Sequence, residues 1–319
     1  MPFPSSPVVA GSTLALQDRA RDDRTTWQQD LSSLRRAGFL AVDLVDSWLA
    51  PANLPTADRA FLRECLAQEG LRLVGLSLIR RSIIDPEHAR ENMAYTHSSI
   101  ETAHSLGAQV VSIGFHRPLT EEQKGAFPFW AVPGPRDPVD RATRHEAVRS
   151  LRELCHHAKD MDVVLSLELY EDTLLGSGRA AAALVEDVAE DNMGINADLA
   201  NLWRQPVELG EHWRETLARC LPYMNYWHVK NFRRAPVWPA GPFVTFPCPL
   251  ADGDIDYHEA FQMAAAAGYA GPICIEHYGG DRLWAQKAAL EYVMWLLTET
   301  EPHEQSDPKS RGRLAPGAI

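Results

Sequence analysis

The sequence has no long hydrophobic run. Among its 319 residues, no stretch approaches the ~20 apolar residues that a helix needs to span a membrane. The first residues, MPFPSSPVVAGSTL, contain neither the basic segment nor the apolar core of a secretory signal. These two absences argue against a membrane anchor and predict a cytoplasmic protein.

Cysteine is scarce and scattered. The chain has five cysteines, an odd number, and no two of them form a C-x-x-C pair. This spacing predicts neither a disulfide framework nor a zinc knuckle. We expect reduced and mostly buried thiols at Cys65, Cys155, Cys220, Cys248 and Cys274.

Positive charge is also in short supply. The net charge is −12, and the only adjacent basic pairs worth noting lie in SLRRAG, LIRRS and NFRRA. Proteins that bind nucleic acid or anionic membranes neutralise phosphates with larger basic patches. The balance therefore argues against both partners and favours a small neutral substrate or a metal cation.

Short β-branched runs alternate with longer segments of helical period along the whole chain. The expected strands are residues 7–13, 40–45, 71–78, 108–115, 162–169, 192–199, 224–229 and 271–277. The helices that follow are expected at 24–37, from 56, at 86–107, from 140, and at 178–191, 207–221, 257–268 and 282–297. Eight such units predict a (β/α)8 TIM barrel. We expect one barrel domain over residues 1–299 and a disordered tail over 300–319.

The competing fold for this pattern is a doubly wound sheet. That fold places a Gly-rich phosphate turn after its first strand, and VVAGSTLALQ has no G-x-G-x-x-G. The barrel is therefore favoured.

Two connections are longer than is usual between such units. Residues 125–138 follow the fourth strand and residues 233–254 follow the seventh, and both are rich in Pro and aromatics. Barrel active sites are built at this end of the strands, so we expect both loops to act as lids. Their Trp130 and Trp238 either stack on a sugar ring or an attached group, or are buried at a subunit interface.

Four polar residues lie near the ends of the fifth to eighth strands. They are Glu168, Asp198, His228 and Glu276. Three carboxylates so close together would repel one another unless a cation compensates their charge. One imidazole with several oxygen ligands suits Mn²⁺ or Mg²⁺, with Co²⁺ as a substitute, better than Zn²⁺. The pattern predicts one divalent metal ion at the barrel mouth.

Other candidates surround this predicted site. His116 ends the fourth strand, where it either relays a proton to the substrate or serves a structural loop. Lys230 follows His228 by two residues and points the same way, towards a substrate hydroxyl or a carboxylate. Asp281 reads as a helix N-cap and would repel a phosphate there, so the substrate is expected to lack phosphate.

The four motifs, taken in order, resemble a known family. LELYED (Glu168), NADLAN (Asp198), YWHVKN (His228) and IEHYGG (Glu276) are similar to the sugar phosphate isomerase/epimerase family, the xylose-isomerase-like barrels. That family includes ketose 3-epimerases and inosose dehydratases, and the likeness covers most of residues 8–298. The resemblance implies that these four residues hold the cation.

The resemblance also implies roles for individual residues. It makes Glu168 and Glu276 the acid/base pair and Arg234, six residues after the metal histidine, a substrate-binding residue. Asn201 stands where ketose epimerases usually have a histidine beside the substrate, and Asn231 replaces the acid of the common HVKD.

Several functions share the first chemical step. A cation bridging a sugar carbonyl and the next hydroxyl favours loss of the α-proton, giving an enediolate. Return of the proton gives an epimerase or an isomerase of a free sugar, which is the leading interpretation. Loss of a substituent gives a lyase, as in the large subunit of C-glycoside deglycosidases, which needs a small partner subunit. The long aromatic loops and the two motif departures favour this alternative.

Two further functional classes remain. The resemblance also extends to barrel endonucleases, but their zinc clusters use many histidines, and the acidic charge here opposes DNA. A noncatalytic sugar-binding barrel is the other possibility. We expect a carbohydrate substrate, no nucleic acid or membrane partner, and a homo-oligomer, or a small partner subunit if the lyase interpretation holds.

Overall fold

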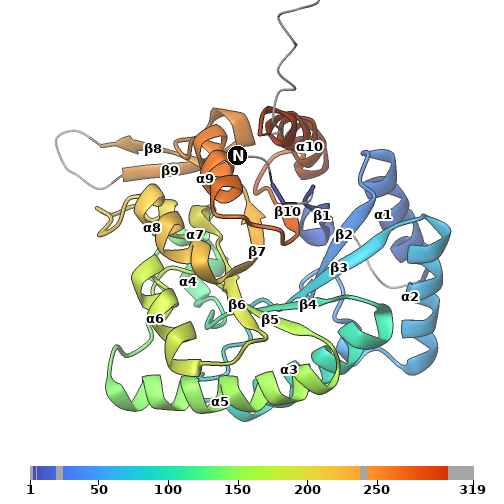
Figure 1. Cartoon of the computed structure of the whole chain (residues 1–319), viewed down its shortest axis with the longest axis horizontal. Coiled ribbons are helices and arrows are strands. Elements are labelled where there is room, and N and C mark those ends of the chain that lie inside the picture. The colour runs from blue at the N-terminus through green and yellow to red at the C-terminus, as the bar shows by residue number, and fades with distance from the viewer. Residues whose placement is uncertain (1–2, 5, 19–23, 238–242, 301–319) are drawn as a thin grey trace, which may run out of the picture.

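The computed structural model of the chain describes residues 3–4, 6–18, 24–237 and 243–300. Eight parallel strands close into a barrel, and helices pack around its outside (Figure 1). The barrel strands are β1 (Val9–Ser12), β2 (Ala41–Val45), β3 (Arg72–Ser77), β4 (Val110–Ile113), β5 (Val164–Glu168), β6 (Met193–Asn196), β7 (Met224–Val229) and β10 (Ile273–Ile275). Pairing of β10 with both β7 and β1 closes the ring. The predicted (β/α)8 barrel is confirmed.

The helices follow the strands in the expected alternation. The main ones are α1 (Arg24–Arg36), α2 (Thr56–Gln68), α3 (Ala89–Leu106), α5 (Arg141–Asp160), α6 (Gly178–Val188), α8 (Trp213–Cys220), α9 (Tyr257–Ala266) and α10 (Arg282–Glu299). Shorter elements are α4 (Glu121–Lys124), α7 (Leu199–Trp203) and the 3-10 turns η1 (Thr13–Leu16), η2 (Pro51–Asn53), η3 (Phe129–Ala131), η4 (Leu221–Tyr223) and η5 (Leu250–Asp252).

Side-chain caps fix where several helices begin. Asp140, Ser177 and Asp256 each accept a hydrogen bond from a backbone N–H of the first turn of α5, α6 and α9. Asp281 does the same for α10, with its Oδ1 3.0 Å from the backbone N of Trp284. The prediction that Asp281 is an N-cap is confirmed.

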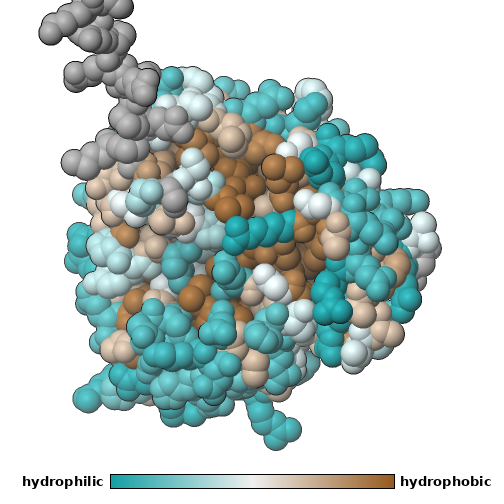
Figure 2. All heavy atoms as spheres, turned by 45° about the vertical axis from the view of Figure 1, so that its right-hand side comes forward, coloured by the Kyte–Doolittle hydropathy of each residue, from teal (hydrophilic) through white to brown (hydrophobic). Residues whose placement is uncertain are grey.

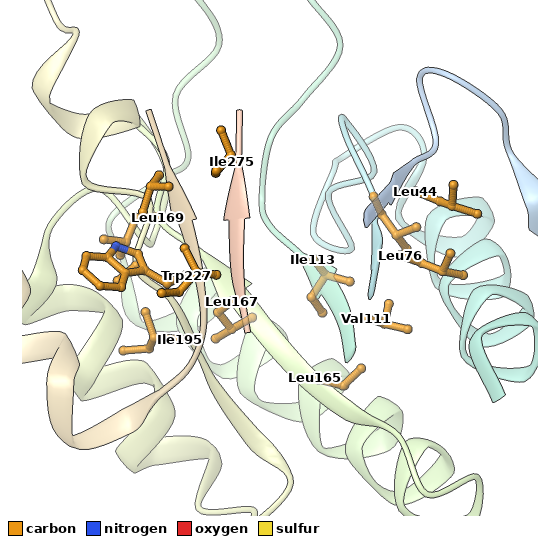
Figure 3. Close-up of a cluster of buried hydrophobic side chains, with 14 of the residues drawn as sticks. Leu44, Leu76, Val111, Ile113, Leu165, Leu167, Leu169, Ile195, Trp227 and Ile275 are labelled. Atoms are coloured by element: carbon orange, nitrogen blue, oxygen red, sulfur yellow. The ribbon is translucent and has the colours of Figure 1, made fainter. Parts of the chain in front are cut away.

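Successive strand residues point alternately into the barrel and out towards the helices. The outward residues are large and apolar, and Figure 3 shows Leu165, Leu167 and Trp227 among them. The inward residues form a small separate core that contains Ala10, Ala41, Val74, Val110, Tyr226 and Cys274. The same alternation carries polar side chains into the interior near the carboxyl ends of the strands.

The connection after β7 differs from the predicted loop. Within it, β8 (Asn231–Pro236) pairs with β9 (Phe243–Cys248) as an antiparallel ribbon. Pro236 and Pro247 obscured the strand pattern in the sequence, but an exposed two-stranded ribbon tolerates proline where an N–H faces away from its partner. Trp238 and residues 301–319 lie outside the described residues, so the expectations for them stay predictions.

The surface is mixed in character. On the face shown in Figure 2, hydrophobic residues form a continuous area bordered by hydrophilic ones. On α10, Trp284, Met294 and Trp295 are 64%, 50% and 48% exposed. Within the described ranges, no helix combines the length and the apolar character that crossing a bilayer requires. The expected homo-oligomer stays a prediction.

Candidate active site

Four side chains from consecutive strand ends meet at the barrel mouth. Glu168 is the last residue of β5, Asp198 follows β6, His228 lies in β7 and Glu276 follows β10. One potential ligand atom from each lies within 4.8 Å of the other three, and all four residues are buried. The structure therefore brings together the four residues that the sequence singled out.

The donor atoms have the spacing of ligands to one cation. His228 Nδ1 lies 3.6 Å from Glu168 Oε1 and 3.4 Å from Glu276 Oε1. Two donors that are each about 2.1 Å from one cation lie ~3.0 Å apart at a right angle and ~3.4 Å apart in a tetrahedron. His228 Nδ1 is also buried without a hydrogen-bond partner, although a ring nitrogen normally has one. The residues present fit a divalent cation.

Lys230 joins this cluster and pairs with two of its carboxylates. Its Nζ donates to Asp198 Oδ2 and lies 2.6 Å from Glu276 Oε2. Burial alone would lower the pKa of Lys230, but Asp198 and Glu276 hold it well above its usual range. Of the two roles considered for Lys230, the structure shows the pairing with carboxylates. The lysine leaves Glu276 Oε1 facing His228.

Without a cation, the pKa values of the side chains in the cluster are shifted by burial and by the excess of acidic groups. Burial alone would lower the pKa of His228, but Glu276 and Glu168 raise it to about 9. Burial raises the pKa of Asp198 to about 6, against the opposing effect of Lys230. Burial would also raise the pKa of Glu168, but neighbouring His228 holds it well below its usual range. The acidic side chains thus favour the protonated forms of His228 and Lys230.

His116 lies beside Glu168. Its Nε2 is 3.7 Å from Glu168 Oε2, and its ring centroid is 4.2 Å from that of Tyr170. Both ring nitrogens are buried without a hydrogen-bond partner. Burial lowers the pKa of His116 to about 4, so the ring is neutral at neutral pH. Its contact with a substrate stays a prediction.

The predicted substrate-binding residues have different surroundings. Asn201 Nδ2 donates to Glu168 Oε1 at 3.0 Å, so this residue belongs to the cluster's immediate surroundings. Trp130 is buried, and its Nε1 donates to Thr245 Oγ1 at 2.9 Å. Arg234 donates to the carbonyls of Trp203, Gln205 and Val207, so its described bonds tie the β8–β9 ribbon to the end of α7 and the segment that follows it. Its role in substrate binding stays a prediction.

A buried ion pair that the sequence does not predict lies above the cluster. Arg204 is fully buried and forms a bidentate pair with Glu171, with distances of 2.8 and 3.0 Å from Nη2 to the two carboxylate oxygens. Four aromatic rings surround its guanidinium at 4.9–5.7 Å, those of Phe129, Trp130, Tyr170 and Tyr278. The only sequence signal was that Glu171 follows Glu168 by three residues.

A cavity of about 760 Å³ lies next to this aromatic group. Arg80, Phe127, Phe129 and Tyr278 are among its lining residues, and the rest come from segments that follow β1 to β4 and β10. Tyr278 borders both, because it lines the cavity and its ring lies 5.3 Å from Lys230 Nζ. The cavity therefore opens on the same end of the barrel as the cluster.

The family model described as xylose isomerase-like TIM barrel matches residues 31–298. The chain belongs to this family. A crystal structure of a xylose isomerase-like TIM barrel protein from Mycobacterium smegmatis in complex with magnesium is 36% identical, with a TM-score of 0.87. The match covers 94% of this chain and 99% of that one.

More distant relatives carry specific names. An L-ribulose 3-epimerase from Mesorhizobium japonicum is 23% identical over 275 residues, which span 84% of this chain and 82% of that protein. A crystal structure of the IOLI protein with a zinc atom is 15% identical, with a TM-score of 0.67 over 92% of this chain and 99% of that one. At this identity, the structural match supports the fold alone.

Proposed function

We propose that the protein is a divalent-metal-dependent sugar isomerase or epimerase that removes a proton next to a sugar carbonyl. The observation that carries the proposal is the buried cluster at the barrel mouth, in which His228 Nδ1 faces oxygens of Glu168 and Glu276 at 3.6 and 3.4 Å. The named similarity to an L-ribulose 3-epimerase supports the same reaction class.

Glu168, Asp198, His228 and Glu276 would hold the cation. The 36% identical relative solved with magnesium supports a divalent ion, and the oxygen-rich ligand set favours Mn²⁺ or Mg²⁺, with Co²⁺ as a substitute. When bound there, such an ion would polarise the substrate carbonyl and stabilise the charge of the enediolate.

The two glutamates differ in what their second oxygen faces. Glu276 Oε2 is paired with Lys230, whereas Glu168 Oε2 faces neutral His116 at 3.7 Å. Asn201 fixes the orientation of Glu168 by donating to its Oε1. Because neutral His116 is not an ion-pair partner, Oε2 of Glu168 is better placed to take a proton from the substrate. Glu276 lies beside the ammonium group of Lys230 and suits the return of a proton at the other face of the substrate.

The surroundings keep water from the reacting groups. Glu168 is 6% exposed and Glu276 5%, and the rings of Trp130, Phe129 and Tyr278 contact one another nearby. A dry site strengthens the interactions of charged side chains with a substrate and protects an enediolate from side reactions. The aromatic group therefore suits the role of a cover for the site.

Proton exchange from solvent tests this function. Metal-stripped protein is reloaded with Mn²⁺ and incubated with free ketoses in D₂O, and deuterium next to the carbonyl is followed by NMR. Uptake that requires both protein and metal supports the proposal. An absence of uptake across a panel of ketoses, with metal bound, argues against it.

A lyase is the second candidate, and the cavity of about 760 Å³ favours it. Phe127 and Phe129 line this cavity and could contact a group attached to a sugar that is bound at the cluster. Assays on 3-keto-glycosides, with and without a small partner subunit, separate cleavage from epimerisation.

We propose that the protein is cytoplasmic, whichever of the two reactions it catalyses. All five cysteines are buried and unpaired, which fits a reducing compartment.

A further inference from the structure

A second group of polar side chains lies inside the barrel beneath the cluster. Asp43, in β2, is fully buried and accepts hydrogen bonds at Oδ1 from Tyr226 OH at 2.9 Å and from Ser77 Oγ at 3.1 Å. Ser77 Oγ also lies 3.5 Å from His228 Nε2. The chain Asp43, Ser77, His228 therefore runs from the barrel interior to the candidate ligands.

The hydrogen atoms in this chain can be assigned. A serine hydroxyl has one hydrogen, and Ser77 gives it to Asp43, an acceptor when ionised. Ser77 Oγ can then only accept from His228, so Nε2 must carry the hydrogen. The neutral imidazole is left with its lone pair on Nδ1, the nitrogen that faces Glu168 and Glu276.

We infer that Asp43 and Ser77 are positioning residues that hold His228 in the Nε2–H tautomer and so make Nδ1 available to a metal ion. This inference rests on the metal site of the proposed function. In metal sites, a ligating histidine usually donates its other N–H to an outer partner that fixes the tautomer and the ring orientation.

The packing around Asp43 leaves it little freedom. A Cβ at position 75 would lie 2.8 Å from Asp43 Oδ1 and 3.2 Å from Tyr226 OH, so glycine at this position makes room for the pair. The Tyr226 ring also packs edge-on against His228, with centroids 5.0 Å apart. Asp43 Oδ2 has no hydrogen-bond partner, and a ring nitrogen of His228 lies within 4.8 Å of this carboxylate. Asp43 is thus fixed beside the imidazole.

The experiment compares the Mn²⁺ affinity of the metal-stripped full-length chain with that of three variants by isothermal titration calorimetry. Asp43→Asn and Ser77→Ala should weaken binding by about 10-fold to 100-fold, the usual effect of losing an outer partner. Asp30→Asn is the matched control, because Asp30 is also a buried aspartate but accepts from Trp48 Nε1 on the outer side of the barrel. Its Mn²⁺ affinity should equal that of the wild type.

A folded Asp43→Asn that binds Mn²⁺ within twofold of the wild type overturns the inference. If Asp43→Asn does not fold, Ser77→Ala decides on the same criterion, because it breaks the chain and leaves the carboxylate in place.

A second readout needs no metal. In the metal-free protein at alkaline pH, the ¹⁵N shifts of His228 should report the Nε2–H tautomer, and Ser77→Ala should lose this preference. If the wild type binds no Mn²⁺ but its His228 has this tautomer, the proposed function is contradicted and the inference about the tautomer stands. An Nδ1–H tautomer overturns the inference.

Discussion

The ammonium group of Lys230 lies 2.6 Å from Oε2 of Glu276, at a depth where both side chains are almost fully buried. Because the lysine also pairs with Asp198, it compensates part of the charge of three carboxylates. Its charge alone leaves two carboxylates of the cluster uncompensated, which explains why His228 takes up a proton so readily. Two uncompensated negative charges match the charge of one divalent cation.

Replacing His228 by Ala should remove one ligand without unfolding the barrel, since the side chain lies at the mouth and outside the apolar core. We expect Mn²⁺ affinity to fall by more than about 100-fold, beyond the usual effect of losing an outer partner. Calorimetry measures the affinity, and circular dichroism checks the fold. His116→Ala is the control, because His116 is equally buried but lies outside the four ligands. A His228→Ala chain that does not fold would show that the imidazole is structural.

Metal affinity should depend on pH. Without a cation, His228 has a pKa raised to about 9, so below that pH it carries a proton that a cation must displace. Affinity should therefore rise about tenfold per pH unit up to about pH 9 and then level off. Titrations in buffers of different ionisation enthalpy should show release of about one proton near neutral pH. Affinity that stays constant between pH 6 and pH 8 would contradict this account.

Glu168→Gln and Glu276→Gln test the acid/base assignment. An amide oxygen can still ligate a metal, so each variant should keep some Mn²⁺, while solvent exchange into the substrate falls by a factor of about 10² or more. Glu211→Gln is the control, because this glutamate accepts from the backbone at the start of α6 instead. If both variants exchange at near-wild-type rates with metal bound, another group, His116 or Lys230, moves the proton.

The ion pair between Arg204 and Glu171 should stabilise the closed aromatic group. Arg204→Met leaves Glu171 buried and unpaired, so the free energy of unfolding should drop by about 3–5 kcal/mol. Adding Glu171→Leu should recover part of this loss, since both charges are then gone. Denaturant unfolding of the four proteins of this cycle measures the coupling. Strictly additive losses would show that the two side chains do not act as a pair.

The candidate ligands could be predicted because their positions follow from local rules. Strand period places Glu168 and His228 on the inner face, and strand order makes their ends neighbours. The strand period also predicts the direction of Lys230. It does not predict that Lys230 pairs with Asp198 and Glu276, because those contacts depend on side-chain rotamers.

Contacts across the barrel could not be predicted from the sequence. Asp43 is the single acid of the strand Ala41–Val45, but nothing in the sequence points to its partner Tyr226, which lies in β7, a strand that is not paired with β2. The Arg204–Glu171 pair joins the end of α7 to the segment after β5, whose paths depend on the packing of the whole mouth. The β8–β9 ribbon was missed because its prolines resemble loop residues.

The most direct test of the central claim is an anomalous difference map from crystals of the wild-type protein grown with Mn²⁺. The account predicts one strong peak per chain at about 2.0–2.3 Å from oxygens of Glu168, Asp198 and Glu276 and from Nδ1 of His228. A map with no peak among these four residues, or with the manganese bound only elsewhere, would contradict it.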